Sequence, residues 1–409
     1  MSVRAETFQL GGRVAGARQI AIAGIALGVV AFWLALPPLH YRTIAVPIVV
    51  GFIAIAAGLV AVVGGERRAG WGAVATGVVG IVGGAFSTRA TVPHLTAVIT
   101  WSTLTAGMLR SATPLTFAAI GGMFSERSGV VNIGLEGMML MGAFFGAYGA
   151  DVTNSWVGGL FVGMAAGAAL ALVHAFFSIH LRVDQIVGGT AVNFLALGIT
   201  GYLYIDLYGD RGTPNDLPAV PDVTFNWLGH VPPHGLGRFL DDAFGGLNLL
   251  VWISFAVLIV SYVVMFKTPI GLRIRSVGEH PRAADTVGIS VYGVRYVAVT
   301  TSGALAALGG VFLSIGFVHS FTENMTAGRG FIALAALIFG NWRPFPAFGA
   351  ALLFGFASAL APQLQNVDSW ATYGTLFSAL PYLLTLIAVA GVIGRSIPPA
   401  AIGRPYQKQ

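Results

Sequence analysis

Apolar runs separated by short polar stretches dominate the chain. A helix needs about 20 apolar residues to cross the hydrocarbon of a bilayer, and runs near this length predict spanning helices throughout. These runs cover residues 19–36, 44–63, 71–86, 130–149, 156–181, 186–207, 248–266, 296–317, 345–360 and 375–394. The pattern therefore predicts an all-α polytopic membrane protein.

Two further apolar runs, residues 112–124 and 328–340, are too short for a straight crossing. Short segments at corresponding places in the two halves of a membrane protein point to a transport site. Residues 94–111 are less apolar, and we expect them to form an interfacial helix before the chain re-enters the membrane at Thr113. A fourth full span is the alternative.

Counting the short segments gives about twelve membrane segments, with the N- and C-termini cytoplasmic. This arrangement places 16 of the 22 basic residues inside and leaves six outside, namely Arg42, Arg89, Arg110, Arg211, Arg238 and Arg329. Cytoplasmic loops carry an excess of Lys and Arg, so the asymmetry supports both the count and the orientation. An additional span at residues 94–111 would reverse this bias.

Composition narrows the class of protein. Hydrophobic residues make up 56% of the chain and charged residues 9%, and the mean hydropathy is +0.80, as in an integral membrane protein. The net charge of +6 follows from topology rather than from a nucleic-acid partner. Without cysteine there is no thiolate catalysis, and the histidines lack metal-site spacing. No GxxxxGK[ST] phosphate loop occurs, so ATP would need another chain.

Several polar side chains lie within or beside the predicted membrane segments. Glu136 could line a translocation pathway, form a structural hydrogen bond that orients Asn132 or a backbone break, or bind a proton. Arg329, like Arg110, could attract a polar ligand or anchor a segment at the interface. Asn193 could bind substrate or bond a neighbouring helix. The candidate pathway residues are Thr113, Asn132, Glu136, Asn193 and Arg329.

Two polar loops stand out. Residues 208–247 form the largest loop, which the orientation places outside. Residues 267–295 form a cytoplasmic loop with five basic residues and a helix-capable core at 281–287. This loop could dock a partner, or it could be an ordinary basic loop that follows the topology.

Three motifs carry a resemblance to a known family: SERSGVVNIGLEGMM at 125–139, SVGEHPRAADTVGI at 276–289 and GRGFIALAALIFGNW at 328–342. They resemble the permease subunits of ATP-binding-cassette (ABC) importers in the branched-chain amino acid, ribose and nucleoside group, with the nearest likeness to the nucleoside and simple-sugar branch. The resemblance covers roughly residues 113–395. It implies a cytoplasmic ABC ATPase that binds ATP and Mg, a second permease subunit that is a related chain, and an extracytoplasmic substrate-binding lipoprotein.

The resemblance also implies roles for individual residues. The segment 276–289 would seat in a groove of the ATPase and couple it to the permease, through Ser276, Gly278, Glu279, Pro281, Ala284 and Gly288. His280 stands where the family pattern usually has Asn. Asn132, Gly134, Glu136 and Gly137 match the NIGLEG motif, which we place beside the pathway. The outside loop at 208–247 would help dock the binding protein.

We therefore expect a non-enzymatic subunit of the bacterial plasma membrane, surrounded by lipid, with no cofactor of its own and no nucleic-acid partner. Residues 1–93 would be an extension with three spans, 94–395 the permease core and 396–409 a cytoplasmic tail. The expected function is ATP-driven import of nucleosides or simple sugars by alternating access. The competing hypotheses are an ion-coupled secondary transporter that uses Glu136, and a passive channel.

Overall fold

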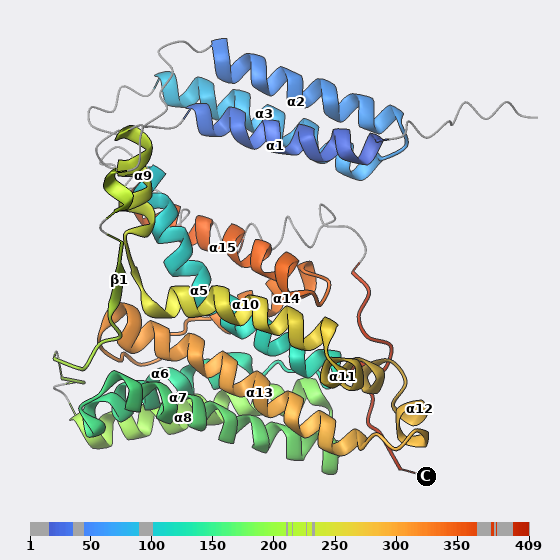
Figure 1. The fold of residues 1–409 in the computed structure, drawn as a ribbon, viewed down its shortest axis with the longest axis vertical. Coiled ribbons are helices and arrows are strands. Elements are labelled where there is room, and N and C mark those ends of the chain that lie inside the picture. Colours follow the sequence, from blue (N-terminus) through green and yellow to red (C-terminus); the bar gives the residue numbers. More distant parts are fainter. Residues whose placement is uncertain are drawn as a thin grey trace, which may run out of the picture. The chain divides into compact units, whose positions relative to one another are not determined.

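The computed structural model describes residues 16–35, 45–89, 101–209, 212–214, 216–225, 227–230, 234–365, 378–379, 382 and 396–408. These residues are overwhelmingly helical (Figure 1). Six of the described helices are long and apolar enough to cross a membrane. The predicted helical membrane protein is thus confirmed, whereas twelve crossings and the position of the termini remain predictions.

The chain divides into two compact units, of which the first contains the three N-terminal helices. These are α1 (Ala17–Ala35), α2 (Ala45–Val63) and α3 (Arg67–Arg89), at the positions predicted for the first three spans. All three pack against one another. Their apolar side chains also remain widely exposed, as expected of helices that face lipid.

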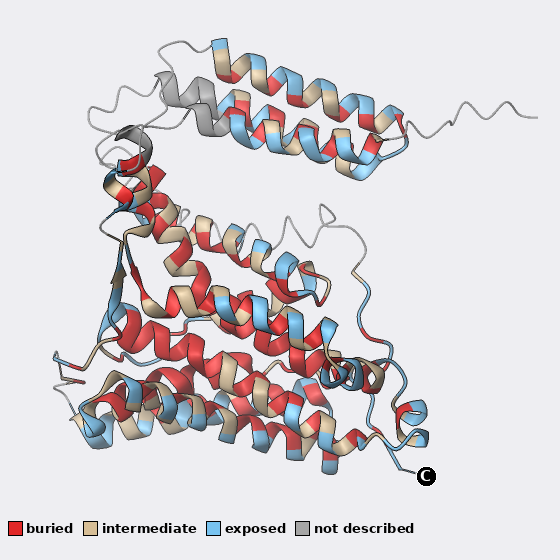
Figure 2. Cartoon of the chain, in the orientation of Figure 1, coloured by how far each residue is buried: buried red, intermediate tan, exposed pale blue. Residues whose placement is uncertain are grey.

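The second unit holds the remaining long helices. They are α5 (Trp101–Arg127), α6 (Leu135–Thr153), α7 (Trp156–Ala175) with a π-helical turn (Phe176–His180), α8 (Gln185–Tyr208), α10 (Leu249–Lys267), α13 (Val291–Val311) with a second π-helical turn (Phe312–Val318), α14 (Arg329–Phe339) and α15 (Pro344–Gln365). In an 18-residue apolar stretch of the span formed by α13 and its π-turn, 72% of the residues are buried, against 28% in the corresponding stretch of α8. Helix α13 is therefore central, whereas most of α8 is exposed at the surface of this unit (Figure 2).

The prediction of a short segment at 112–124 preceded by an interfacial helix was wrong. Residues 101–127 form one continuous helix, α5, although Pro114 lies inside it, and residues 94–100 lie outside the described part. A proline inside a helix removes one backbone hydrogen bond, but every residue from 112 to 126 is buried, so tertiary packing outweighs this loss. One long helix replaces one short segment, so the predicted number of crossings does not change.

Other differences are smaller. Helix α6 begins at Leu135 rather than at Val130, because residues 130–134 are not helical. Arg295, expected in the cytoplasmic loop, lies in α13 and is only 1% exposed, since its guanidinium donates to the Ser128 and Arg404 carbonyls. The short segment at 328–340 is confirmed as α14, whereas the span predicted at 375–394 lies almost wholly outside the described residues.

The two predicted polar loops contain secondary structure. The loop at 208–247 holds a 3-10 turn (Leu228–His230), α9 (His234–Phe244) and strand β1 (Asp222–Thr224), which pairs antiparallel with β2 (Gly246–Asn248). The loop at 267–295 folds into α11 (Pro269–Glu279) and α12 (Pro281–Thr286). Figure 1 shows α9 and β1 at the N-terminal end of α10, and α11, α12 and the C-terminus at its other end.

Candidate functional site

The carboxylate of Glu136 lies at the N-terminus of α14. Its Oε1 accepts hydrogen bonds from Thr326 Oγ1 at 2.6 Å and Gly328 N at 2.8 Å, and its Oε2 accepts one from Gly330 N at 2.6 Å. The first N–H groups of a helix lack partners within the helix and form the positive end of its dipole. Glu136 satisfies these groups and so fastens the start of α6 to the start of the short helix.

Gly330 makes this junction possible. A Cβ atom at this position would lie 2.5 Å from the backbone nitrogen of Glu136. Only glycine therefore lets α14 approach α6 closely enough for the carboxylate to reach its N-terminus. This contact brings the GRGF and LEG sequences together in the fold.

A cavity of about 310 Å³ opens beside the start of α14, between α5, α15 and the π-helical end of α13. Arg110 and Arg329 both line it, together with Ser111 and Ser358. Arg329 Nη1 donates to the carbonyls of Met325 and Thr326, at 2.9 and 3.2 Å. Arg110 Nη2 donates to Gly246 O at 3.1 Å. These bonds hold the two cationic side chains at one cavity, although 218 positions separate them along the sequence.

The cavity also contains aromatic rings. Phe312 and Phe317 line it and stack on each other with centroids 6.1 Å apart and planes 15° apart. Thr113 does not line it, because its Oγ1 donates to Leu109 O one turn earlier in α5 and the residue is buried. Serine hydroxyls, guanidinium groups and aromatic faces in one hollow can hold a flat, polar solute.

Between α5 and α6 the chain is unwound, and side chains from other helices bind its backbone. Val131 N donates to Gln185 Oε1 of α8 at 2.7 Å, and His174 Nε2 of α7 lies 3.0 Å from Val131 O. Asn193 of α8 donates to Ile133 O at 3.0 Å and accepts from Gly137 N at 2.8 Å. Backbone groups inside a membrane protein need such partners, because lipid supplies none.

Asn132 lies in the middle of this unwound segment and is completely buried. Its Nδ2 donates to Ser302 Oγ of α13 at 2.8 Å, while its Oδ1 has no hydrogen-bond partner among the described residues. Of the predicted pathway residues, the structure thus brings Glu136 and Arg329 to the start of α14. It places Asn132 and Asn193 at the backbone break and Thr113 inside α5.

The predicted coupling segment, residues 276–289, has an inner face that packs on the membrane helices and an outer face that is exposed. Gly278 is buried at the end of α11, where a Cβ atom would collide with the carbonyl oxygen of Arg127 at the end of α5. Ala284 of α12 is buried beside Val277 and Val291. These contacts fasten the segment to the membrane helices. A mechanical input to α11 would therefore act directly on α5.

The outer face contains the other predicted coupling residues. Ser276 Oγ donates back to Leu272 O at 2.8 Å, and Pro281 begins α12. Glu279 is exposed, with its Oε2 accepting from Ala400 N at 3.1 Å. Gly288 is exposed and has a φ of +83°, a conformation that favours glycine. It turns the chain from α12 toward α13.

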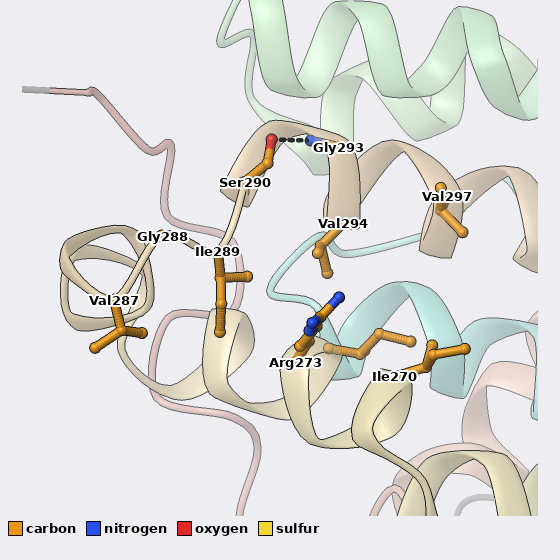
Figure 3. A pocket seen from close by; sticks show the side chains of 10 residues that line it. Ile270, Arg273, Val287, Gly288, Ile289, Ser290, Gly293, Val294 and Val297 are labelled. Carbon is orange, nitrogen blue, oxygen red and sulfur yellow. Dashed lines mark hydrogen bonds between the residues drawn. The ribbon is translucent and has the colours of Figure 1, made fainter.

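Gly288 borders a groove of about 490 Å³ between α11 and the start of α13 (Figure 3). Ile270 and Arg273 come from α11 and Val294 and Val297 from α13, with Ile289 between them at one end. Most of these side chains are aliphatic, so the groove offers apolar surface at the end of the molecule that carries the coupling segment.

The same end contains a junction that the sequence analysis missed. Trp342 Nε1 donates to Glu126 Oε2 at 2.5 Å, and Arg127 donates to the carbonyls of Trp342 and Asn341 at 3.0 and 3.3 Å. The end of α5 is thus bound to the end of α14. The ER and NW pairs within two of the motifs were its only sequence signal. Among the described residues, no cluster of three or more His, Cys, Asp or Glu side chains could hold a metal ion.

Comparisons with known proteins agree with these features. The family described as "Branched-chain amino acid transport system / permease component" matches residues 104–389. The guanosine ABC transporter permease protein NupQ of Bacillus subtilis is 43% identical over 306 residues, which cover 73% of this chain and 94% of NupQ. The nucleoside ABC transporter permease protein NupC of Lactococcus lactis is 37% identical over 327 residues, 77% of this chain and 99% of NupC.

The glucose ABC transporter permease protein TsgB13 of Haloferax volcanii is 29% identical over 243 residues, which cover 57% of this chain and 63% of TsgB13. No solved structure matched the chain. The resemblance drawn from the three motifs is confirmed. This chain belongs to the branched-chain amino acid transport system permease family, and it is an integral membrane subunit of an ABC transporter rather than an enzyme.

Proposed function

We propose that this chain is a permease subunit of an ABC importer that takes up nucleosides by ATP-driven alternating access. The observation that carries the coupling is the position of α11 and α12, which lie at one end of the bundle and include Glu279 and Pro281, with the exposed Gly288 in the turn that follows α12. Permeases of ABC importers generally work with an ATPase and a second permease. In this proposal a separate ATPase binds the outer face and moves α5 through Gly278.

The substrate class rests on two independent features. The relatives named above for guanosine and for nucleosides match nearly their whole length. The cavity combines the stacked rings of Phe312 and Phe317 with the guanidinium groups of Arg110 and Arg329. Aromatic faces stack on nucleobases, and arginine forks recognise purine acceptors. A simple sugar is the second candidate, because the relative TsgB13 is named for glucose.

The decisive experiment is reconstitution of the chain with its ATPase, partner permease and binding protein in liposomes. We expect uptake of radiolabelled guanosine or adenosine that requires ATP hydrolysis and persists with a protonophore present. Uptake of radiolabelled glucose that unlabelled nucleosides do not reduce, with no uptake of labelled nucleosides, would favour the sugar. Uptake that needs no ATP and is abolished by the protonophore would contradict the proposal and favour an ion-coupled secondary transporter.

Substitution within the cavity tests its role. Phe317→Leu keeps apolar volume but removes the aromatic face, so we expect weaker nucleoside transport by about tenfold, the scale of one stacking contact. ATPase association should not change. Phe161→Leu is the matched control, because Phe161 is exposed on α7 and does not line the cavity. Equal transport by both variants would remove the cavity from the pathway.

A further inference from the structure

The C-terminal tail, residues 396–408, lies against the coupling segment through a series of backbone hydrogen bonds. Ala401 N donates to Gly278 O at 2.9 Å, and Ala400 N donates to Glu279 Oε2 at 3.1 Å. Gly403 N donates to Gly129 O at 3.1 Å, where the unwound segment begins. The tail is therefore an ordered part of this end of the molecule.

Tyr406 anchors the tail to α12 and α13. Its hydroxyl donates to Asp285 Oδ2 at 2.8 Å, and its carbonyl accepts from the Tyr292 hydroxyl at 3.3 Å. The residue is 6% exposed and packs in a small cluster with Val277, Ala284 and Val291. Burial and the neighbouring Asp285 carboxylate raise the pKa of the Tyr406 hydroxyl, so it remains a donor at neutral pH.

Arg295 joins the tail to the membrane helices. From α13 its Nε donates to Ser128 O and its Nη1 to Arg404 O, both at 3.2 Å. The Arg404 backbone is thereby held, and its exposed side chain projects at the surface. A groove of about 650 Å³ runs between the tail and residues 279–282, with Arg282 and Arg404 among its lining side chains.

Basic side chains outnumber acidic ones on the exposed surface of α11, α12 and the tail. Both carboxylates of the coupling segment, Glu279 and Asp285, accept hydrogen bonds from the tail. The exposed basic side chains on α11, α12 and the tail are Arg273, Arg282, Arg404 and Lys408. Neutral groups donate to the two carboxylates, which keep their negative charge, but four exposed basic side chains outnumber them. The face formed by α11, α12 and the tail is therefore net basic and complements an acidic partner.

We propose that the tail and the coupling segment together form one docking surface for the ATPase, with an acidic edge of the ATPase lying in the groove between Arg282 and Arg404. This inference deepens the proposed function and rests on it. The groove is continuous with the outer face of α12, so a partner that binds Glu279 and Pro281 also meets the tail. Tyr406 acts as a positioning residue that holds Arg404 and the tail in place.

The test measures binding of the purified ATPase to the full-length chain, assembled with its partner permease in nanodiscs, across a range of salt concentrations. The Arg404→Glu variant should bind about tenfold more weakly at low salt, because a rim charge is reversed. Arg404→Lys should bind like the wild type. Arg238→Glu is the control, since Arg238 is exposed on α9 at the opposite end.

The positioning role has its own test. Tyr406→Ala should weaken ATPase binding, whereas Tyr406→Phe, which keeps the packed ring, should retain most of it. Thermal unfolding of each variant separates loss of docking from loss of fold. A Tyr406→Ala protein that unfolds at the wild-type temperature and binds the ATPase normally would contradict this role.

The outcomes distinguish the inference from the function on which it rests. If the wild-type chain binds no ATPase, the proposed function fails. If the wild type binds and Arg404→Glu binds equally well, the docking role of the tail is overturned. It is likewise overturned if Arg404→Glu changes only binding to vesicles that contain phosphatidylglycerol, because the basic face would then serve anionic lipid.

Discussion

At the scale of single residues, Glu136 shows how a buried carboxylate can hold a membrane protein together. Three donors surround its two oxygens, and all three belong to the segment that begins α14. The sequence hypotheses for this residue were pathway lining, a structural bond and proton binding. The geometry supplies the partners that a structural role needs, while a direct role in transport stays a prediction.

Replacing Glu136 by Gln tests this geometry. The amide NH₂ group would face an N–H donor of α14, and one bond to a charged acceptor, worth about 1.5–3 kcal/mol, would be lost. We expect a lower unfolding temperature and clearly reduced uptake with the ATPase still bound. Asp151→Asn is the control on the same helix, because Asp151 accepts from Tyr208 far from α14. Wild-type stability and uptake in Glu136→Gln would contradict both roles.

Asn193 fills a comparable role at the unwound segment, since one amide satisfies two backbone groups. The Asn193→Leu substitution leaves Ile133 O and Gly137 N without these partners, at a cost of about 1–3 kcal/mol for each buried group. Thermal unfolding in detergent should show a large loss. Thr200→Val, which removes only a bond within α8, should cost much less. Equal losses would show that the break does not depend on Asn193.

At the scale of elements, the short helix α14 is fixed at both ends. Glu136 binds its start, while Arg127 and Glu126 bind the residues that follow its end. An 11-residue helix spans only about 16 Å, so α14 is too short to cross the hydrocarbon of a bilayer alone. The polar groups of its N-terminus are satisfied by protein, as an apolar environment requires.

The contact between α11 and α5 is another element-scale feature, and a larger residue at Gly278 should disrupt it. The new Cβ of Gly278→Val would collide with backbone at Arg127, which cannot move without shifting α5. We expect loss of ATP-dependent uptake and displacement of α11, measured by protease sensitivity of the coupling segment. Gly349→Val on α15 is the control, because no atom lies within 4 Å of the added Cβ. Equal uptake and equal protease sensitivity in the two variants would show that the contact between α11 and α5 is not important for transport.

At the scale of the whole molecule, contacts distinguish two ends of the second unit, and which end faces the cytoplasm can be tested. Arg110 meets Gly246 near α9, whereas Arg127, Asn341, Gly278 and the tail meet at the other end of the second unit. The positive-inside asymmetry predicts that this latter end is cytoplasmic. The matched family segment starts at residue 104, so α1 to α3 lie outside it.

The absence of cysteine from the chain makes the orientation directly measurable. Arg238→Cys on α9 should react with a membrane-impermeant maleimide in intact cells. Ala283→Cys on α12 should react only after the membrane is opened, because α12 faces the cytoplasm in the predicted topology. Both positions are exposed. The reverse labelling pattern would show that the chain is inserted the other way round.

The sequence by itself determined the class of the protein and the place of most helices. Long apolar runs can only be spans in lipid, so the described helices fall close to the predicted ranges. The three motifs identified the family, and the structure places residues from them, such as Glu136, Gly278 and Gly330, at close contacts. Segment 112–124 misled the prediction, since Pro114 and nearby charges suggested a break that burial on all sides overrides.

Only the tertiary structure decided which polar residues meet. Several hydrogen-bonded pairs are far apart in sequence, and no local sequence pattern predicts them. These pairs are Glu136 with Gly330, Asn132 with Ser302, and Gly278 with Ala401. The same holds for the tail, whose short sequence gives no periodic signal. Its backbone N–H groups donate to α11 and to the unwound segment. Burial of apolar side chains acts on each segment separately, so the sequence of a segment is enough to predict it. Hydrogen bonds between distant segments depend on the packed arrangement of all the helices.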